Sequence, residues 1–274
     1  MGATGRMGGA VLRHADGPKR AGTRSGTTVA DASETVRFDL DDPATFALAL
    51  DGCDAMFVMR PPPSTTREPF DRLMLAAREE GIGFVVCASV FGADGSRVLP
   101  HRYMEASVKS SGIPHVFLRP ADFMQNLADI HGKRIRDEGR IVVPAGKGRS
   151  AFVDVEDIGI ATVAVLQDRE RCVGQGYDLT GPQALMFGDV ARTMSEVLGR
   201  SIAYVPVSVP RFIASELRRG RSLALALVMS ALYSVQRFGR AAPVKPDFER
   251  LTGQKAGDLA SYVERERAAF APQE

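Results

Sequence analysis

Short apolar runs alternate with longer amphipathic segments through the first half of the chain. The runs CDAMFVM (53–59) and GFVVCASV (83–90) are apolar along their whole length, which is typical of strands buried on both faces of a parallel sheet. The first of them is expected to stop at the prolines of RPPP (60–63). We predict further strands at 19–24, 36–40 and 113–120, and helices at 8–15, 41–50, 67–80, 99–111 and 122–138. This alternation predicts an α/β fold with a doubly wound parallel sheet.

Beyond Arg140 the alternation loosens. We predict strands at 140–144, 150–155, 176–180 and 202–208, helices at 154–167 and 187–200, and mostly helical structure over 210–270. The expected division is 1–140 for the main sheet and 141–274 for interleaved strands and a smaller, mostly helical substrate lobe over its carboxyl edge. The most apolar stretch, 223–233, falls short of the roughly 18 residues of a membrane helix and predicts a buried helix.

Composition and charge narrow the class of protein. The 274 residues include 35 Lys and Arg against 33 Asp and Glu, a net charge of +2, and the basic residues are scattered. This balance disfavours nucleic acid as a partner. The three cysteines, Cys53, Cys87 and Cys172, are odd in number and widely spaced, which favours reduced thiols in a cytoplasmic protein. The four histidines show no metal-ligand spacing, so no metal is assigned.

The chain opens with a glycine-rich turn, GATGRMGG, before the first predicted helix. Such glycines let the backbone approach a pyrophosphate, and the unpaired N–H groups at the start of the helix face its charge. A turn of this kind normally follows a buried strand. We expect this central strand to lie upstream of Met1, because its loss would leave two neighbouring strands with unpaired backbone groups. The residues assigned to the cofactor turn are Gly2, Ala3, Thr4, Gly5, Arg6, Met7 and Gly8.

Residues at the carboxyl ends of the predicted strands would lie along the path of a bound dinucleotide. Arg24 ends the strand at 19–24 and suits the 2′-phosphate of NADP, although a solvated surface arginine would look the same in sequence. NADP is therefore favoured, and NAD stays open. Asp39 would either accept a hydrogen bond from the adenine amine or cap the next helix. The other strand-end residues assigned to the cofactor are Leu40, Met59, Arg60, Pro61, Ser89 and Val90.

Six segments together resemble one protein family: GATGRMGG, VRFDLDDPATF, VMRPP, SGIPHVFLRPADFMQN, VPAGKGRSAFVDVEDI and YDLTGP. In order and spacing they are similar to the NmrA-like, NAD(P)-binding branch of the atypical short-chain dehydrogenase/reductases, over nearly the whole chain. The resemblance implies a Rossmann domain with a small C-terminal lobe and a nicotinamide dinucleotide as ligand. It leaves activity open, because the family is similar in fold to both reductases and non-catalytic redox sensors.

The segment HRYMEASVKSSG bears on catalysis. Classical members of the wider superfamily use Tyr-x-x-x-Lys, in which the ammonium lowers the pKa of the tyrosine. Here Ser107 stands four residues after Tyr103, and Lys109 stands six after it, on a different face of the helix. The dyad is therefore absent at this site. The remaining candidates for proton donation are Ser89, Tyr103 and His101, and Ser89 has the best case because it ends a strand.

The segment FMQN follows the strand at 113–120 and would reach the nicotinamide and substrate pocket. Its residues Phe123, Met124 and Asn126 are the candidates, although a core aromatic and a helix cap are nearly as well supported. Further apolar residues that would shape such a pocket, unless they simply pack in the core, are Phe187, Phe212, Met229 and Tyr233.

Two functions compete. An NAD(P)H-dependent oxidoreductase would reduce a small, largely apolar acceptor of the quinone, enone or imine class, relying on positioning rather than on an acid dyad. A non-catalytic NAD(P)-sensing regulatory protein would change a partner contact on binding, and the missing dyad favours it. The same absence argues against a nucleotide-sugar epimerase. We expect a small-molecule substrate, no nucleic acid and no membrane partner, and a homo-oligomer stays open.

Overall fold

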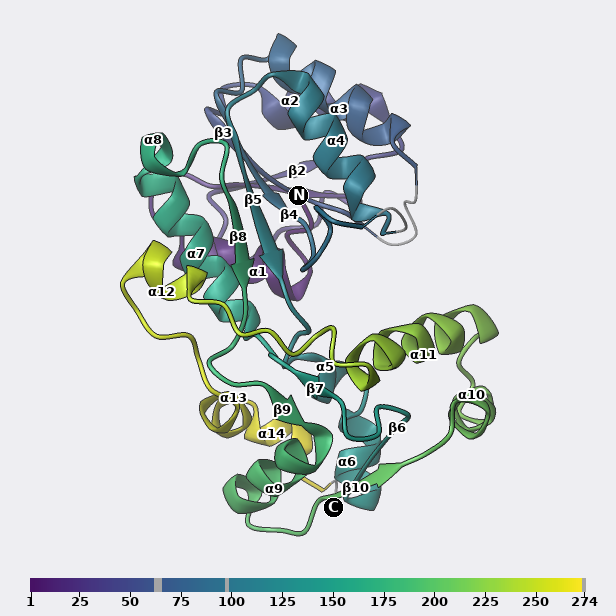
Figure 1. Ribbon diagram of the computed structural model, residues 1–274. Coiled ribbons are helices and arrows are strands. Elements are labelled where there is room, and N and C mark those ends of the chain that lie inside the picture. The colour runs from purple at the N-terminus through teal and green to yellow at the C-terminus, as the bar shows by residue number, and fades with distance from the viewer. Residues whose placement is uncertain (62–65, 97–98, 273–274) are drawn as a thin grey trace. The chain divides into compact units, whose positions relative to one another are not determined.

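The computed structural model describes residues 1–61, 66–96 and 99–272 (Figure 1). Contacts divide the chain into two compact units, each made of several segments. The first unit comprises Met1–Pro120, Val155–Leu179 and Asp247–Gln254, and the second comprises Ala121–Asp154, Thr180–Pro246 and Lys255–Glu274. The prolines at 62 and 63, where we expected a strand to stop, lie outside the described residues.

Parallel strands build the first unit. Every residue of β4 is buried, as its unbroken apolar run predicts. The predicted α/β fold with a parallel sheet is confirmed. Four strands pair side by side in the order β3 (Ala55–Met59), β4 (Phe84–Ala88), β5 (His115–Pro120) and β8 (Gly176–Leu179). A separate parallel pair consists of β1 (Arg20–Thr23) and β2 (Glu34–Arg37).

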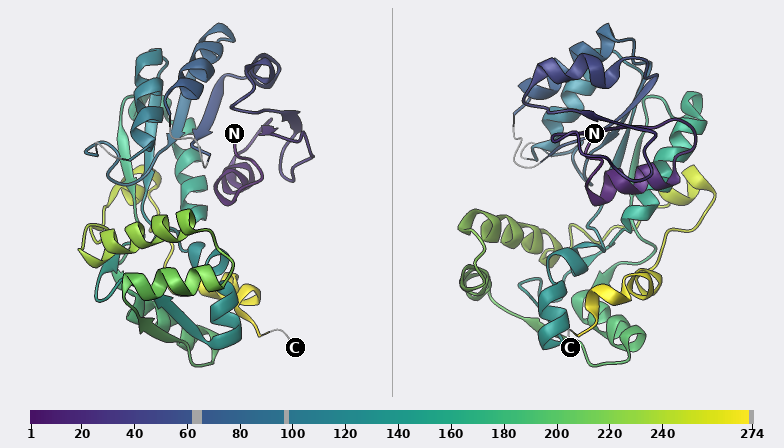
Figure 2. Two further views of the ribbon diagram at one scale, coloured as in Figure 1. Left: turned by 90° about the vertical axis from the view of Figure 1, so that its right-hand side faces the viewer. Right: turned by 180° about the vertical axis from the view of Figure 1, so that it is seen from behind.

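Helices cover both faces of these strands (Figures 1 and 2). One face carries α2 (Phe46–Leu50), α3 (Glu68–Glu79) and α4 (His101–Ser111), and the other carries α1 (Arg6–His14) and α7 (Val155–Gln167). The shorter elements of this unit are the 3-10 turn η1 (Pro43–Thr45), α8 (Arg169–Cys172) and α12 (Asp247–Thr252).

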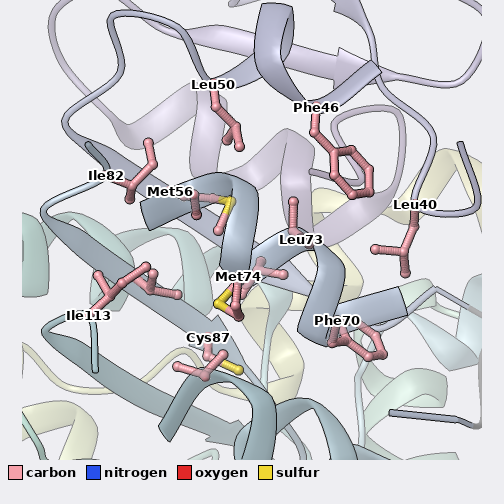
Figure 3. Close-up of a cluster of buried hydrophobic side chains, with 14 of the residues drawn as sticks. Leu40, Phe46, Leu50, Met56, Phe70, Leu73, Met74, Ile82, Cys87 and Ile113 are labelled. Carbon is pink, nitrogen blue, oxygen red and sulfur yellow. The ribbon is translucent and has the colours of Figure 1, made fainter. Parts of the chain in front are cut away.

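The main core of the first unit lies between α3 and the sheet. Phe70, Leu73 and Met74 recur at helical spacing along α3 and are almost fully buried. They pack in one cluster with Met56 of β3 and Cys87 of β4 (Figure 3). This packing fixes α3 to the strands whose carboxyl ends form the candidate site.

On the opposite face, α1 packs closely on α7. A side chain added at Gly159 of α7 would place its Cβ 2.7 Å from the carbonyl oxygen of Ala10 in α1, so only glycine allows this approach. Glu156 of α7 forms ion pairs with Arg13 and with His14, and its Oε2 lies 2.9 Å from the His14 Nε2. The contacts of Gly159 and Glu156 therefore fix the position of α1 against α7.

The second unit is mostly helical. Its strands form two short pairs, β6 (Arg140–Val143) parallel to β10 (Ala203–Pro206), and β7 (Arg149–Ser150) antiparallel to β9 (Leu185–Met186). Its helices are α5 (Asn126–Asp129), α6 (Gly132–Glu138), α9 (Phe187–Leu198), α10 (Val209–Arg218), α11 (Leu223–Arg237), α13 (Leu259–Arg265) and α14 (Arg267–Phe270).

Some predicted elements were wrong in extent. The strand expected at 150–155 is limited to β7, which ends at Ser150. The helix expected at 122–138 is the two helices α5 and α6, and it begins only at Asn126 because the Met124 N–H donates to the Val153 carbonyl at 3.0 Å. The strand expected at 36–40 ends at Arg37, because the Asp39 N–H donates to the Thr45 hydroxyl at 3.0 Å. At Met124 and at Asp39 a long-range or side-chain hydrogen bond replaces the regular one.

The prediction of a buried helix over 223–233 was half wrong. One stripe of α11, with Ala226, Met229 and Tyr233 at helical spacing, is buried. The apolar residues of its other face are exposed, among them Leu225, Leu227, Val228 and Leu232. Among the described residues, no helix combines the length and the apolar character that a membrane crossing requires.

Candidate functional site

The glycine turn is tightly folded against the end of β3. Gly2 has a φ of +72°, a conformation that favours glycine, and a Cβ there would lie 2.6 Å from the Sδ of Met59. The Gly5 N–H donates to the Gly2 carbonyl at 3.0 Å and closes the turn. The structure thus brings Gly2 and Met59 together at the end of β3, and their contact with a cofactor stays a prediction.

The start of α1 has neither a capping side chain nor an acidic residue. Gly5 caps the helix without a side-chain hydrogen bond, and no acidic residue stands in the first turn. A Cβ on Gly8 would lie 2.2 Å from the Gly2 carbonyl oxygen, so the helix reaches this position only with glycine. The first N–H groups of a helix have no partner within it, and Thr4 and Arg6 at this helix start are exposed. Ala3 and Met7 are buried supports of the same turn.

The strand ends bring further candidates together. Met59 of β3 lies opposite Ala88 of β4, so Arg60 and Ser89 follow at the same edge of the sheet. The Arg60 Nε lies 3.5 Å from the Nε2 of His101, at the start of α4. One residue further along each strand, Pro61 and Val90 are partly buried.

His101 is held neutral. Burial, with a smaller contribution from the Arg60 charge, lowers the pKa of His101 to about 4. Its Nδ1 is buried and has no hydrogen-bond partner among the described residues. Because Nε2 faces a cation that can only donate, the neutral ring would carry its proton on Nδ1. This imidazole is a hydrogen-bond donor without an acceptor.

Ser89 adjoins a buried ion pair. The Arg119 guanidinium of β5 donates two hydrogen bonds of 2.9 Å to the Glu105 carboxylate of α4. Burial works to raise the pKa of Glu105, but the hydrogen bonds from Arg119, the nearby Ser89 hydroxyl and the positive charges of Arg119 and Lys109 leave it lowered. Glu105 is therefore a carboxylate that fixes α4 to β5, and the Ser89 Oγ is buried without a hydrogen-bond partner among the described residues.

Tyr103 and Lys109 contact different groups. The Tyr103 hydroxyl accepts a hydrogen bond of 2.6 Å from Arg102, whose guanidinium also lies over the ring. The Lys109 ammonium lies 3.9 Å from Glu105 and over the ring of Phe117. Each side chain therefore has its own partners in this structure, and the absence of a Tyr-Lys acid pair stays a prediction.

The residues expected near the adenosine differ in character. Arg24 is exposed directly after β1 and has no hydrogen-bond partner among the described residues. The neighbouring Thr23 hydroxyl is buried and equally without a partner among them. Asp39 accepts a hydrogen bond of 3.1 Å from the Asp41 N–H, so it supports a turn, and the Leu40 side chain packs in the core. Their contacts with a cofactor stay predictions.

In the second unit, Phe123 and Asn126 line a small cavity of about 30 Å³. Met124, assigned to the same pocket, is buried in the core cluster instead. Other lining residues are Phe187, Met229 and Tyr233, which also belong to the core cluster, whereas Phe212 packs behind Tyr233 with ring centroids 5.5 Å apart. The cavity is apolar on most sides, and its volume is about that of one water molecule.

The sequence pattern of the NmrA-like family matches residues 1–264. This chain belongs to the NmrA-like family. An NAD(P)H azoreductase from Xenophilus azovorans is 30% identical to it over 281 residues, which cover 98% of each protein.

Two solved structures share the NmrA-like fold of this chain. Citrobacter sp. triphenylmethane reductase complexed with NADP(H) has a TM-score of 0.83 at 25% identity, covering 96% of this chain and 97% of that one. NmrA, a negative transcriptional regulator in complex with NADP, has a TM-score of 0.73 at 16% identity, covering 96% and 92%. The second likeness shows the fold alone, so the shared fold accommodates a reductase and a regulator.

Sequence reasoning missed one polar residue of this NmrA-like chain, Asp122. It lines the cavity of the second unit, where its carboxylate accepts hydrogen bonds from Asn126, at 2.9 Å, and from Gln236. Burial raises the pKa of Asp122 to about 6 despite these bonds. The available signal was its place between the strand end at Pro120 and the apolar FM, where a carboxylate is unusual.

Proposed function

We propose that the chain is an NADPH-dependent oxidoreductase that reduces a small, largely apolar, conjugated acceptor of the quinone, enone or imine class. The observation that carries the proposal is the uncapped start of α1 against the turn at Gly2, where only glycine at position 8 permits the packing. Two orphaned polar groups, the Thr23 hydroxyl and the His101 Nδ1, also fit a bound nucleotide better than an empty edge. The azo and triphenylmethane substrates named for similar proteins are extended conjugated systems.

A reduced nicotinamide supplies a hydride when it is bound. The residues of this chain would hold it: the N–H groups of α1 at the pyrophosphate, and Arg24 at a 2′-phosphate. The neutral His101 would donate a hydrogen bond from Nδ1 at the edge formed by Arg60 and Ser89. Tyr103 and Lys109 would not act as an acid pair, so the rate would rest on positioning and on the reactivity of the acceptor.

The test measures NADPH consumption against a panel of quinones, enones, imines and azo dyes, with a matched pair of variants. Gly8→Ala places a Cβ against the Gly2 carbonyl and should weaken NADPH binding by ~100-fold or more, because α1 must move off the turn. Gly9→Ala is the control, since its Cβ meets only the flexible end of Arg13, at 3.3 Å. Equal NADPH affinity in the two variants would contradict the assignment of the turn.

Arg24→Ala separates NADP from NAD. It should weaken NADPH binding by ~10-fold while leaving NADH binding unchanged, because only the former carries the 2′-phosphate. An equal loss of affinity for NADPH and NADH would show that Arg24 does not contact the 2′-phosphate.

A sensing protein without catalysis is the second candidate. It is favoured by the engagement of one candidate hydroxyl within the protein, that of Tyr103, which accepts a hydrogen bond from Arg102. Tight NADPH binding with no turnover on any acceptor, together with an NADPH-dependent change in light scattering, would support it over the oxidoreductase.

A further inference from the structure

The small cavity of the second unit has a carboxylate in its wall that no positive charge compensates. Asp122 is partly buried there, and its carboxylate accepts hydrogen bonds from the side-chain amides of Asn126, at 2.9 Å, and Gln236. Among the described residues no Lys, Arg or His forms an ion pair with it, and no positive charge lowers its pKa. With a pKa of about 6, the group is mainly ionised at neutral pH. A cation at this wall would offset the cost of holding that charge away from water.

The contact with Asp122 also fixes which way the Gln236 amide faces. A carboxylate only accepts hydrogen bonds, so the Nε2 of Gln236 must point to it and the Oε1 must point away. Gln236 is 4% exposed, and its Oε1 is buried with no hydrogen-bond partner among the described residues. The carboxylate itself has about four acceptor sites and can take a further bond. Both open positions at this wall are acceptors, so the group that completes them is a donor.

The other walls of the cavity suit the head of an organic cation. Four aromatic side chains contribute to the lining, those of Phe123, Phe152, Phe187 and Tyr233, and aromatic rings attract ammonium groups. No cluster of three metal-ligating side chains occurs in the part of the chain that the structure describes. The cavity volume, about 30 Å³, is close to that of one water molecule. A primary ammonium group has this size, whereas a quaternary one with three methyl groups is larger.

The mouth of the cavity lies on the exposed apolar face of α11. Leu232 lines the cavity and is nevertheless 57% exposed. Leu225 and Val228 stand seven and four residues before it, so the three exposed side chains follow one stripe of the helix. A molecule with its ammonium group in the cavity could therefore lay an apolar body against this stripe.

We propose that the cavity binds the primary ammonium group of an amine whose remaining structure is apolar. The ammonium would donate to the Asp122 carboxylate and to the Gln236 Oε1, and the apolar body would cover the stripe that ends at Leu232. This inference rests on the proposed function in one respect, because the amine is taken to be the acceptor, which would then carry an aminoalkyl substituent.

Calorimetric titration of the 274-residue chain at neutral pH compares three probes of similar shape. Benzylammonium has the charge and the N–H donors, benzyl alcohol has a donor without the charge, and benzyltrimethylammonium has the charge without a donor. Benzylammonium should bind ~10-fold or more tightly than either of the others, because only it can make a charge-assisted hydrogen bond. Equal affinities for the three probes would overturn the proposal.

A first pair of variants tests the carboxylate. Asp122→Asn should weaken benzylammonium binding by ~10-fold or more and leave benzyl alcohol binding unchanged, because it removes the charge and keeps the shape. Asp129→Asn removes the same charge from an exposed position in α5 and should have little effect. Benzylammonium affinity that is equally high in both variants would overturn the proposal.

A second pair of variants tests the mouth at positions where folding is not at risk, because both side chains are exposed. Leu232→Lys brings a positive charge to the cavity and should weaken benzylammonium binding by ~10-fold. Leu227→Lys places the same charge on α11 outside the lining and serves as the control. An equal effect of the two substitutions would place the ammonium elsewhere and overturn the proposal.

NADPH consumption separates this proposal from the proposed function. An enone with an aminoalkyl substituent should have a KM ~10-fold lower than the same enone without it, and Asp122→Asn should abolish that difference while kcat on the unsubstituted enone stays unchanged. Equal KM values in the parent chain would overturn the assignment of the amine to the acceptor. Selective benzylammonium binding without turnover of any acceptor would contradict the proposed function and support the ammonium site.

Discussion

Two histidines, the half-buried His101 of the first unit and the buried His131 of the second, have similar electrostatics and different surroundings. His101 of the first unit and His131 of the second both have a pKa lowered mainly by burial, to about 4 and about 3. The His131 ring shares a hydrogen bond of 2.6 Å with the Tyr233 hydroxyl, whereas the His101 Nδ1 has no partner among the described residues. The bond of His131 is structural, and the unpaired Nδ1 of His101 is what makes His101 a candidate for a ligand contact.

The largest expected effect is on turnover. His101→Phe should lower kcat/KM by ~100-fold on whichever acceptor is turned over, since a buried hydrogen bond to a ligand is lost. The free energy of unfolding should change little, because the one contact of His101 with Arg60 is long, at 3.5 Å. Steady-state kinetics and chemical denaturation measure the two effects. An unchanged kcat/KM in His101→Phe would contradict the view that His101 contacts a ligand whereas His131 has a structural role.

The next effect is on stability alone. His131→Phe should lower the free energy of unfolding by ~1–3 kcal/mol, because the Tyr233 hydroxyl stays buried without its partner. Tyr233→Phe should cost a similar amount. The double variant should recover part of the loss, because both polar partners are then gone, and NADPH affinity should be unchanged throughout. Fully additive losses would show that the two side chains do not depend on each other.

The most gradual effect is a pH dependence that both histidines share. Each takes up its proton more readily in the unfolded chain, near the ordinary value of 6.5, than in the folded one. The free energy of unfolding should therefore fall as the pH drops below about 6.5, by at most ~1.4 kcal/mol per pH unit for each histidine. Denaturation curves between pH 7 and 4 should flatten in His101→Phe and in His131→Phe. Parent-like slopes in both variants would assign the pH dependence to other groups.

Local patterns sufficed for much of the fold and for part of the site. The apolar run of β4 and the helical spacing of α3 are local, so the sheet and its main helix followed from them. Gly2 and Met59 were placed at one edge because the carboxyl ends of parallel strands meet there.

The features that the sequence did not predict depend on contacts between residues that are distant in sequence. The break before α5 depends on the bond from Met124 to Val153, and the exposure of α11 depends on which stripe the second unit covers. The neutral state of His101 and the raised pKa of Asp122 arise from burial, which no neighbouring residue in sequence reveals.

The fit of Gly159 against Ala10 reaches further than packing. Gly159 lies more than 140 residues further along the sequence than Ala10, and its contact with Ala10 fixes where α1 lies relative to the turn at Gly2. A mutant library screened for tighter or altered dinucleotide binding should therefore return changes in α7 as well as in the glycine turn. Cofactor preference in this fold would then depend on two segments that are distant in sequence, the glycine turn and α7, and substitutions in one would require matching substitutions in the other.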